Sequence, residues 1–441
     1  MMKERQQQFL DEVCAEIKAK KAHSEIRQEL ASHLEDLICE KEATGAPQDE
    51  AIAWAITQMG NPQVLGKELH QIHKPRVPWG LFGVVALLSA ISLIGMGSVD
   101  VGYSDIAKGA FLDNALKRQS INILIGIVLM FGLYFIDFRK LKGLSWVLYG
   151  LTLAGILTSM FWGVTVNGVN YGPQIFTILP DMTTYRPYVL MVALTGILVN
   201  RRKVTKSKTW RSGLLDIGIL LVPALLLIFL KSLPELVVYL LSSLVLYVWI
   251  TREWKKSAML FGLLIIAGLI FSLKSDYLMA RFISALNPSS DPEGYGYIYQ
   301  VMREVINSAG WWGHGFGSVE QKLPYVYSDL LPIYLIHCFG WAGGLVLVAV
   351  VACFFIKLLS TVRAIRESYG QALVVGLAFL LAIRLAYGLA VLSGGMMLTS
   401  IPFPFLSYGS HVWFEYAAIG LLMGIYRRKD IGGVQDCTVL G

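Results

Sequence analysis

A short polar stretch just ahead of a long apolar run carries residue types that can do chemistry. Glycines crowd the stretch from Gly310 to Gly317, Leu323-Pro324 follows, and Asp329 stands where the apolar run begins. Glycines this close together are untypical of a helix interior, because each one weakens the helix. A carboxylate at the rim of an apolar segment costs free energy unless it is hydrated or used. A partly desolvated carboxylate can accept a proton from a hydroxyl group, so the stretch predicts a site where membrane meets water.

The composition of the chain is that of a polytopic membrane protein. Of its 441 residues, 55% are hydrophobic and 16% are charged, and the mean hydropathy is +0.56. Residues 1–74 are slightly acidic, so the net charge of +7 lies in the apolar part, and we assign it to loops rather than to nucleic-acid binding. The 5 cysteines are scattered without a Cys-x-x-Cys pair, which disfavours a zinc site or a disulfide framework. Because the first apolar stretch begins near Trp79, we expect no cleavable signal peptide.

Residues 1–75 have the pattern of a small cytoplasmic helical module. Apolar residues recur at helical spacing, with Phe9, Val13 and Ile17 on one face and Ile26, Leu30, Leu34 and Leu37 on another. The runs Gly45-Ala46-Pro47 and Gly60-Asn61-Pro62 interrupt the pattern. The spacing therefore predicts a helical hairpin followed by two shorter helices, around a small core.

Residues 76–430 are predicted to form an all-α membrane domain of about ten spans, followed by a C-terminal tail at 431–441. Each apolar stretch has about the 20 residues that cross a bilayer. The stretches lie at about 79–97, 120–137, 144–165, 186–200, 213–231, 235–251, 257–274, 330–356, 369–392 and 409–426. Lys and Arg follow every even-numbered stretch, so the positive-inside rule predicts that both termini are cytoplasmic. The longest connection, at about 275–329, then lies outside and carries Asp329.

This order of motifs resembles the SEDS family of shape, elongation, division and sporulation proteins, which includes RodA, FtsW and SpoVE. In the long connection the resemblance rests on Arg281, Asn287-Pro288, Gly294-Tyr295-Gly296-Tyr297, Gly313 to Gly317, Leu323-Pro324 and Asp329. A second signature, Pro402-Phe403-Pro404-Phe405-Leu406-Ser407-Tyr408-Gly409, precedes the last span. Weaker likenesses are Arg118-Gln119, Asn167-Gly168 and Pro234-Glu235-Leu236. The resemblance covers residues 79–428, whereas residues 1–75 resemble the helical prefix module found ahead of many bacterial permeases.

The resemblance implies a peptidoglycan glycosyltransferase of the bacterial cytoplasmic membrane that polymerises lipid II, an undecaprenyl-pyrophosphate-linked disaccharide peptide. It implies a class B penicillin-binding protein as partner, membrane lipids as surroundings and no nucleic acid. Asp329 would be the essential aspartate, the general base for an acceptor sugar hydroxyl. A pyrophosphate leaving group needs cationic or N–H partners. The expected substrate-binding residues are Arg281, Lys322, Gly313, Gly315, Gly317, Pro324, Pro404, Ser407, Tyr408 and Gly409. The cofactor is unknown. A pyrophosphate leaving group is compatible with a divalent cation, but no metal-ligand cluster is evident in the sequence.

Arg384, Glu415 and His337 are ionisable residues within predicted spans. Arg384 and Glu415 are expected to pair with each other or to face a central cavity, because buried charges are costly. The alternative is a register shift by one turn, with one of the two snorkelling to the surface. His337 lies eight residues after Asp329, either as a polar member of the same cavity or as a core histidine. The plainer interpretation of Asp329 itself is a helix N-cap or first-turn acid.

Some positions depart from the family pattern. Two glutamates usually stand eight and nine residues after the family's aspartate, and here those positions are His337 and Cys338. Two other functions therefore stay open. One is a non-catalytic relative that scaffolds or regulates wall synthesis, with residues 1–75 as a docking unit. The other is a transporter of the lipid-linked precursor. Formation of glycan polymer by the purified protein would distinguish the glycosyltransferase from these two alternatives.

Overall fold

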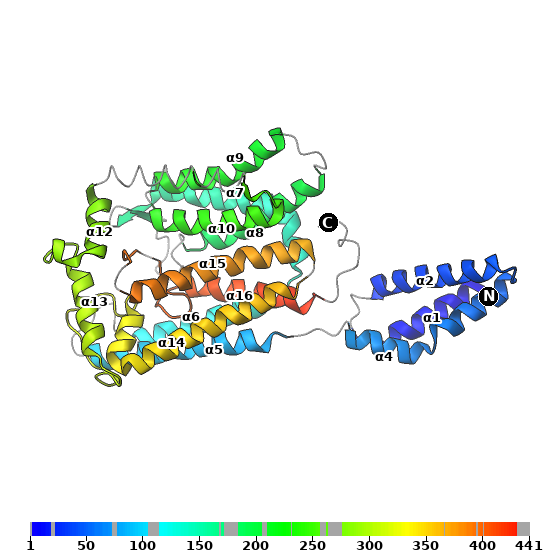
Figure 1. Ribbon diagram of the computed structural model, residues 1–441, viewed down its shortest axis with the longest axis horizontal. Coiled ribbons are helices and arrows are strands. Elements are labelled where there is room, and N and C mark those ends of the chain that lie inside the picture. Colours follow the sequence, from blue (N-terminus) through cyan, green and yellow to red (C-terminus); the bar gives the residue numbers. More distant parts are fainter. Residues whose placement is uncertain are drawn as a thin grey trace. The chain divides into compact units, whose positions relative to one another are not determined.

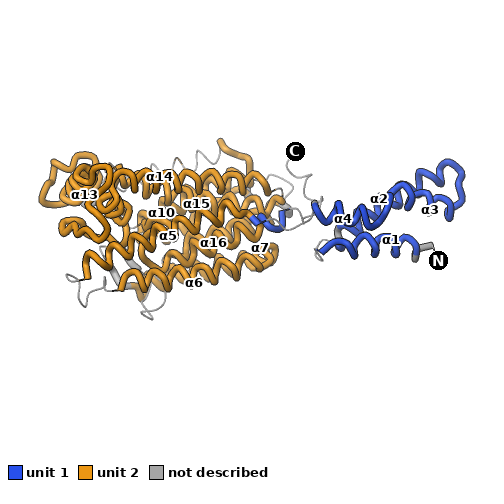
Figure 2. The backbone as a smooth tube through the Cα atoms, turned by 90° about the horizontal axis from the view of Figure 1, so that it is seen from below, with its two compact units in different colours: residues 1–77, 426–441 blue, residues 78–425 orange. Residues whose placement is uncertain are grey.

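The computed structural model describes residues 2–18, 23–72, 77–104, 114–166, 169–171, 184–204, 210–230, 232–255, 262, 276–365, 367–393, 396–399 and 401–429. The chain forms two compact units, one of residues 1–77 with 426–441 and one of residues 78–425 (Figure 2). The order of the elements can be followed in Figure 1.

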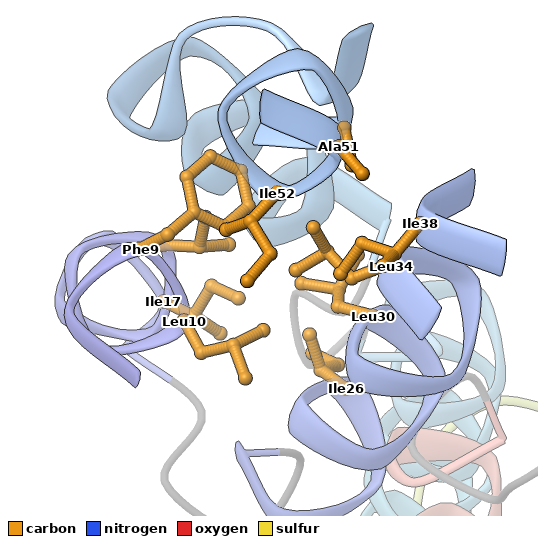
Figure 3. Packing of buried hydrophobic residues seen from close by; sticks show 11 residues of the cluster. Phe9, Leu10, Ile17, Ile26, Leu30, Leu34, Ile38, Ala51 and Ile52 are labelled. Carbon is orange, nitrogen blue, oxygen red and sulfur yellow. The ribbon is translucent and has the colours of Figure 1, made fainter. Parts of the chain in front are cut away.

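The N-terminal part of the first unit is helical. Its elements are α1 (Met2–Glu16), α2 (His23–Ala43), α3 (Gln48–Met59) and α4 (Pro62–Ile72). Phe9 of α1, Leu34 of α2 and Ile52 of α3 meet in one buried apolar cluster (Figure 3). The apolar faces predicted from helical spacing are therefore confirmed. The predicted break after α3 is confirmed as well, because Gly60 adopts a φ of +81° and ends the helix.

The second unit is built from long apolar helices. Its elements are α5 (Trp79–Tyr103), α6 (Ala115–Phe135), α7 (Phe138–Trp162), β1 (Val164–Val166), β2 (Val169–Tyr171), α8 (Arg186–Val204), α9 (Trp210–Phe229), α10 (Leu233–Thr251), α12 (Asp276–Leu286), η2 (Pro288–Ser290), α13 (Tyr297–Ser308), α14 (Leu331–Arg363), α15 (Ser368–Leu392) and α16 (His411–Arg427). Within the described residues, 6 helices are long and apolar enough to cross a membrane: α5, α6, α7, α10, α14 and α15. The predicted all-α, multi-pass class is confirmed, with one short antiparallel hairpin, β1–β2, added to it.

The remaining predicted spans have mixed outcomes. Helices α8, α9 and α16 lie on three further apolar stretches of the sequence. The stretch predicted at 257–274 lies outside the described residues apart from Gly262, so the number of ten spans stays a prediction. On α6 and α7, Leu124, Val128 and Leu151 are each more than 60% exposed. An apolar surface of this kind is suited to contact with lipid chains.

The long connection predicted at 275–329 is a folded layer rather than an open loop. Helices α12 and α13 lie across one end of the spanning helices of the second unit (Figure 1). Helix α13 is amphipathic and buries Tyr299, Met302 and Val305. Those spacings of three residues place the three side chains on one face of the helix. By this apolar face α13 packs against the rest of the second unit, including α14.

Helix α14 is broken at Gly340, whose φ of 70° and ψ of −169° are not helical. The glycine-rich run fills the break with main-chain hydrogen bonds. Its amides at His314 and Gly315 donate to the carbonyls of His337 and Cys338 at 2.9 and 3.0 Å, and its carbonyls at Gly310 and Trp311 accept from the amides of Trp341 and Ala342 at 2.9 and 3.2 Å. The break therefore leaves these groups paired, as a membrane-embedded backbone requires.

Gly313 and Gly340 make this junction sterically feasible. A Cβ on Gly313 would overlap the Cys338 carbonyl, and a Cβ on Gly340 would overlap the Trp311 carbonyl. Both residues also have positive φ, of +72° and +70°. The close glycine spacing in the sequence thus reflects backbone-to-backbone packing.

Replacing Gly340 by alanine is expected to destabilise the second unit by more than about 2 kcal/mol, because the positive φ is strained and the new Cβ meets a carbonyl. The midpoint of thermal unfolding in detergent measures the effect. Gly132→Ala is the matched control, since a Cβ there has nothing within 4 Å. It is expected to leave the midpoint unchanged or raise it, because alanine favours the helix. Equal midpoints for the two variants would contradict this account.

Candidate functional site

Two segments far apart in the sequence lie side by side just before α14. We call residues 402–409 the signature segment. Its Tyr408 amide donates to the Tyr327 carbonyl at 2.9 Å, and its Ser407 hydroxyl donates to the Ser328 carbonyl at 2.9 Å. The same hydroxyl accepts the Phe403 amide at 2.9 Å. These bonds bring the two sequence signatures together beside Asp329.

Helices α5 and α6 also hold the signature segment. Ser92 on α5 donates to the Leu406 carbonyl at 2.7 Å. Gln119 on α6 donates to the Ser407 carbonyl at 3.3 Å and accepts the Gly409 amide at 3.4 Å. Gln119 also donates to Ser92 at 3.1 Å, which links the two helices. Gln119 belongs to one of the weaker sequence likenesses, and here it supports the backbone of the segment.

Asp329 lies in a turn with strained backbone. Tyr325 has a φ of +53°, which is unfavourable for a residue with a side chain. The amides of Ser328 and Leu330 both donate to the Tyr325 carbonyl, at 3.0 and 3.3 Å. Helix α14 begins after Leu330, which caps it without a side-chain bond, and its first turn contains no acid. The interpretation of Asp329 as a helix cap or first-turn acid is therefore wrong, and strain of this kind is typical of functional sites.

The surroundings of Asp329 favour its protonated form. Partial burial raises the pKa of this carboxyl from the ordinary 3.8 to about 6. The hydroxyl of Ser328 donates to Oδ1 at 3.2 Å and opposes part of that rise. In the part of the chain that the structure describes, no cation contributes to lowering this pKa. A carboxylate with these properties is mostly ionised at neutral pH and remains basic enough to accept a proton in a reaction.

Arg281 reaches the loop that leads into the signature segment. Its Nη2 donates to the Leu398 carbonyl at 2.5 Å. The Leu398 amide donates to the Tyr299 hydroxyl at 2.9 Å, so α12 and α13 both contact this loop. Tyr387 of α15 completes the contact, because its hydroxyl donates to the Met397 carbonyl at 2.8 Å. The structure therefore places Arg281 beside the loop at 396–399.

Lys322 and Pro324 lie on the surface. The Lys322 ammonium is 3.9 Å from Glu304, and both side chains are about two-thirds exposed, at 65% and 67%. Pro324 is also exposed, next to buried Leu323. An exposed ion pair of this kind contributes little to the stability of the fold. None of these contacts involves Asp329.

The three glycines expected to bind substrate have their amides engaged within the protein. The Gly313 amide donates to the Ala309 carbonyl at 3.0 Å, the Gly315 amide to Cys338 at 3.0 Å and the Gly317 amide to the Ser98 hydroxyl at 2.9 Å. Each amide has a single proton, and each proton already has an acceptor. These bonds help to build the junction with α14, and substrate binding by the three glycines stays a prediction.

The residues predicted within the signature segment are mostly internal. Pro404 is buried, and Ser407 is fully buried with its hydroxyl engaged. Tyr408 is partly exposed, and its ring meets that of Tyr327 edge to face at 6.1 Å. Gly409 is held by Gln119. These residues therefore support the carboxylate turn, with Tyr408 the one most able to contact a ligand.

The predicted pairing of Arg384 with Glu415 is present in the structure. Arg384 Nη1 lies 3.7 Å from Glu415 Oε1 and donates to the Tyr188 hydroxyl at 2.5 Å. Glu415 Oε2 accepts the Phe405 amide at 2.6 Å. His411, one turn before Glu415, brings its Nε2 within 3.8 Å of Oε1. Because both members of the pair are almost fully buried, neither snorkels to the surface.

His337 faces a different set of residues from Asp329. Its ring stacks on His314 at 4.4 Å, and its Nε2 lies 3.2 Å from the Ser318 hydroxyl. Its Nδ1 is buried without a hydrogen bond. None of these contacts includes Asp329, so the structure gives no support for a shared cavity. Among the described residues there is also no group of three or more His, Cys, Asp or Glu side chains able to hold a metal ion.

Sequence reasoning missed three side chains of this region. Tyr299 and Tyr387 hold the loop at 396–399, and no motif marks them. His411 lies next to Glu415, and its spacing of four residues on a predicted helix was the available signal. The strain at Tyr325 and Phe405, which have φ of +53° and +62°, has no signature in residue type.

Comparison with known proteins shows a family match for the second unit. A family model described as "Cell cycle protein" and named for FtsW, RodA and SpoVE matches residues 78–431. A similar protein from Geobacter sulfurreducens, "Probable peptidoglycan glycosyltransferase FtsW", is 29% identical over 372 residues, which is 79% of this chain and 95% of that protein. A protein of the same name from Synechocystis is 28% identical over 366 residues, covering 80% and 87%.

Two solved structures have a similar fold. One, from "Structural coordination of polymerization and crosslinking by a peptidoglycan synthase complex", has a TM-score of 0.65 at 23% identity and covers 80% of this chain and 98% of that chain. The other, the rod shape determining protein RodA of Thermus thermophilus, has a TM-score of 0.57 at 22% identity, with coverage of 80% and 97%. The arrangement of helices in the second unit is therefore that of these proteins.

Replacing Asp329 by asparagine is expected to stabilise the protein at pH 7.5. The folded state raises the pKa of this acid, so its contribution to stability is present below pH 3.8 and is lost as the pH rises through about 6. Asparagine cannot ionise and avoids that loss. The expected gain is about 1–2 kcal/mol, since partial exposure screens part of the shift.

The unfolding midpoint in detergent, measured at pH 7.5 and pH 5, tests this prediction. The advantage of Asp329→Asn over the wild type is expected to narrow at pH 5. Asp276→Asn, at an exposed carboxylate of α12, is the control and is expected to change neither midpoint by much. A lower midpoint for Asp329→Asn at pH 7.5 would show that the charge stabilises the fold.

Proposed function

The chain belongs to the FtsW, RodA and SpoVE family of cell cycle proteins, and from that premise we propose that it is a peptidoglycan glycosyltransferase that polymerises lipid II at the outer face of the cytoplasmic membrane. The observation that carries the proposal is Asp329. It is a partly buried carboxylate with a raised pKa, held in a strained turn where the two family signatures meet. Relatives named as probable peptidoglycan glycosyltransferases support the same activity.

In this proposal Asp329 is the general base. Its ionised carboxylate accepts the proton of an acceptor sugar hydroxyl as that oxygen attacks the anomeric carbon of the donor. The new C–O bond forms as the bond from the anomeric carbon to the pyrophosphate breaks, so the configuration inverts. A turn that ends directly at a membrane helix suits a substrate whose sugar is in water and whose chain is in lipid.

The leaving pyrophosphate needs positive charge, and we assign this role to Arg281. Its guanidinium is permanently charged, and its bond to the Leu398 carbonyl fixes it beside the loop at 396–399. Arg281 belongs to the outer layer, and the loop that it contacts leads directly into the signature segment. Lys322 is less suited, because it is exposed and faces Glu304. Any divalent cation would be held largely by the pyrophosphate itself.

The remaining assignments follow the same model. The basic connections support a topology with both termini in the cytoplasm and the α12–α13 layer outside. The outer layer is where a class B penicillin-binding protein would supply cross-linking, and the related synthase complex supports a partner of this kind. Residues 1–75 would be a cytoplasmic docking module ahead of the membrane domain at 76–430.

One observation favours a second function, a non-catalytic scaffold or regulator. The family's two glutamates are replaced by His337 and Cys338, and these residues contribute main-chain carbonyls to the glycine junction. His337 stacks on His314 and does not contact the Asp329 turn. If acids at these positions are essential for turnover, the chain would retain the architecture without the activity.

The purified full-length protein, combined with a class B transpeptidase, is expected to form long glycan strands from labelled lipid II. Asp329→Asn is expected to lower the rate by about 100-fold or more, because a general base contributes that much. The wild-type rate is expected to rise with pH through about 6, as Asp329 ionises. Gel separation of labelled strands at pH 5 to 8 measures both effects.

Asp276→Asn is the control for this experiment, since it removes an exposed carboxylate of α12. It is expected to retain wild-type turnover. Polymer made at the wild-type rate by Asp329→Asn would refute the assigned base. If the folded wild type makes no polymer with any partner, the scaffold function takes its place, and transbilayer movement of labelled lipid would instead favour a transporter.

Arg281→Ala is expected to lower kcat/KM by about 10- to 100-fold, the effect of losing one charge-assisted hydrogen bond to the leaving group. Lys322→Ala serves as the matched cation control and is expected to change kcat/KM by less than about 3-fold, because its only described ion pair is exposed. Initial rates at varied lipid II concentration provide the comparison. Equal losses of kcat/KM in the two variants would contradict the assignment of the leaving-group role to Arg281.

A further inference from the structure

Glu415 is buried in α16 and holds a strained main-chain amide. Its side chain is 0% exposed, and its Oε2 accepts the Phe405 amide at 2.6 Å. Phe405 has a φ of +62°, a strained conformation for a residue with a side chain. Its ring packs against Phe354 and Tyr416, with centroids 5.8 and 5.6 Å away. The strained conformation is therefore maintained by one short hydrogen bond and by aromatic packing.

Glu415 Oε1 has one neighbour on α15 and one on its own helix, α16. Arg384 of α15 lies 3.7 Å from Oε1 and is itself fixed by the Tyr188 hydroxyl of α8. His411 of α16 lies 3.8 Å from the same oxygen. A buried charge in a membrane protein is tolerated only when it is paired or used. Here Arg384 and His411 adjoin one carboxyl oxygen of Glu415 while the second oxygen stays directed at Phe405.

Phe405 is linked to Asp329 by a short path. Two residues later, the Ser407 hydroxyl donates to the Ser328 carbonyl at 2.9 Å, and then the Tyr408 amide donates to the Tyr327 carbonyl at 2.9 Å. Ser328 directly precedes Asp329 and donates to its carboxylate. A shift of the backbone at Phe405 therefore moves the groups that hold the Asp329 turn.

We propose that Glu415 is a positioning residue for Asp329, acting through the Phe405 amide and the signature segment. The inference rests on the proposed function for its kinetic consequence, whereas its structural consequence is independent of that function. Arg384 has the subordinate role of holding the Glu415 side chain in place. The requirement is thus for a hydrogen-bond acceptor at residue 415, directed at residue 405.

A matched pair of double variants separates the acceptor from the charge. Arg384→Met with Glu415→Gln removes both charges and keeps an acceptor of the same length. Arg384→Met with Glu415→Leu removes both charges and the acceptor. The Gln variant is expected to stay within about 3-fold of wild-type kcat. The Leu variant is expected to lose about 10- to 100-fold in kcat with little change in KM, because a misplaced base lowers turnover more than binding.

The pH profile separates positioning from a general loss of structure. If the Asp329 turn loosens, the carboxylate gains water and its pKa falls toward the ordinary 3.8. The acid limb of kcat in the Leu variant is then expected to move below its wild-type position near pH 6. Arg201→Met with Asp216→Asn removes another ion pair of the second unit, one of 2.5 Å, and is expected to keep the wild-type rate and profile.

A disulfide measurement tests the inference without any enzyme activity. Tyr327→Cys with Tyr408→Cys places two thiols where an amide and a carbonyl are 2.9 Å apart. Mass spectrometry of the oxidised protein is expected to find this disulfide in high yield in the wild-type and Gln backgrounds, and at least about 5-fold less in the Leu background. Equal yields in the Gln and Leu backgrounds would overturn the inference. If the wild type has no polymerase activity but the disulfide yields still differ between the Gln and Leu backgrounds, the proposed function is refuted and the positioning role of Glu415 is retained.

Glu415→Asp replaces the Leu variant if the latter is not recovered folded. It keeps the charge beside Arg384 and withdraws the acceptor from Phe405 by one methylene. A fall in kcat with a lowered acid limb and a reduced disulfide yield supports the inference. Wild-type values for all three would overturn it.

Discussion

The architecture of the site depends on two main-chain carbonyls, those of Tyr327 and Ser328, being held by the signature segment. A partly buried carboxylate next to a membrane helix is under two opposing demands. Water stabilises its charge, and burial makes it a better base. A turn free to move would resolve this conflict by swinging Asp329 into water. The bonds from Ser407 and Tyr408 prevent that movement without placing a cation beside the carboxylate.

The same demand accounts for the density of support around the signature segment. Ser92 and Gln119 hold its carbonyls and its last amide, and Glu415 holds the amide of its strained residue. The loop that precedes it is fixed by Tyr299, Tyr387 and Arg281. Irregular backbone among membrane helices must have its polar groups satisfied from neighbouring elements. Here that requirement also fixes the segment in a single position.

The sequence predicted the parts of this arrangement that depend on residue type. Apolar length indicated the spans, and a carboxylate at an apolar rim indicated Asp329. The pairing of Arg384 with Glu415 followed from the cost of isolated buried charges. The contact between the signatures was not predictable in this way, because it runs through main-chain carbonyls that every residue has. The junction that the glycines form with α14 was not predictable for a related reason: a glycine indicates close approach of backbone, but not whether the approaching group is a ligand or another part of the chain.

The break in α14 has a consequence for how this protein can diverge. His337 and Cys338 hold the glycine-rich run through their carbonyls, whereas Gly313 and Gly340 hold it by lacking side chains. The first two positions can exchange side chains without loss of the junction. The two glycines cannot compensate for each other, since enlarging one cannot be offset by shrinking the other. A changed side chain at position 337 or 338 can therefore coexist with an intact junction. A side chain at position 313 or 340 would disrupt it.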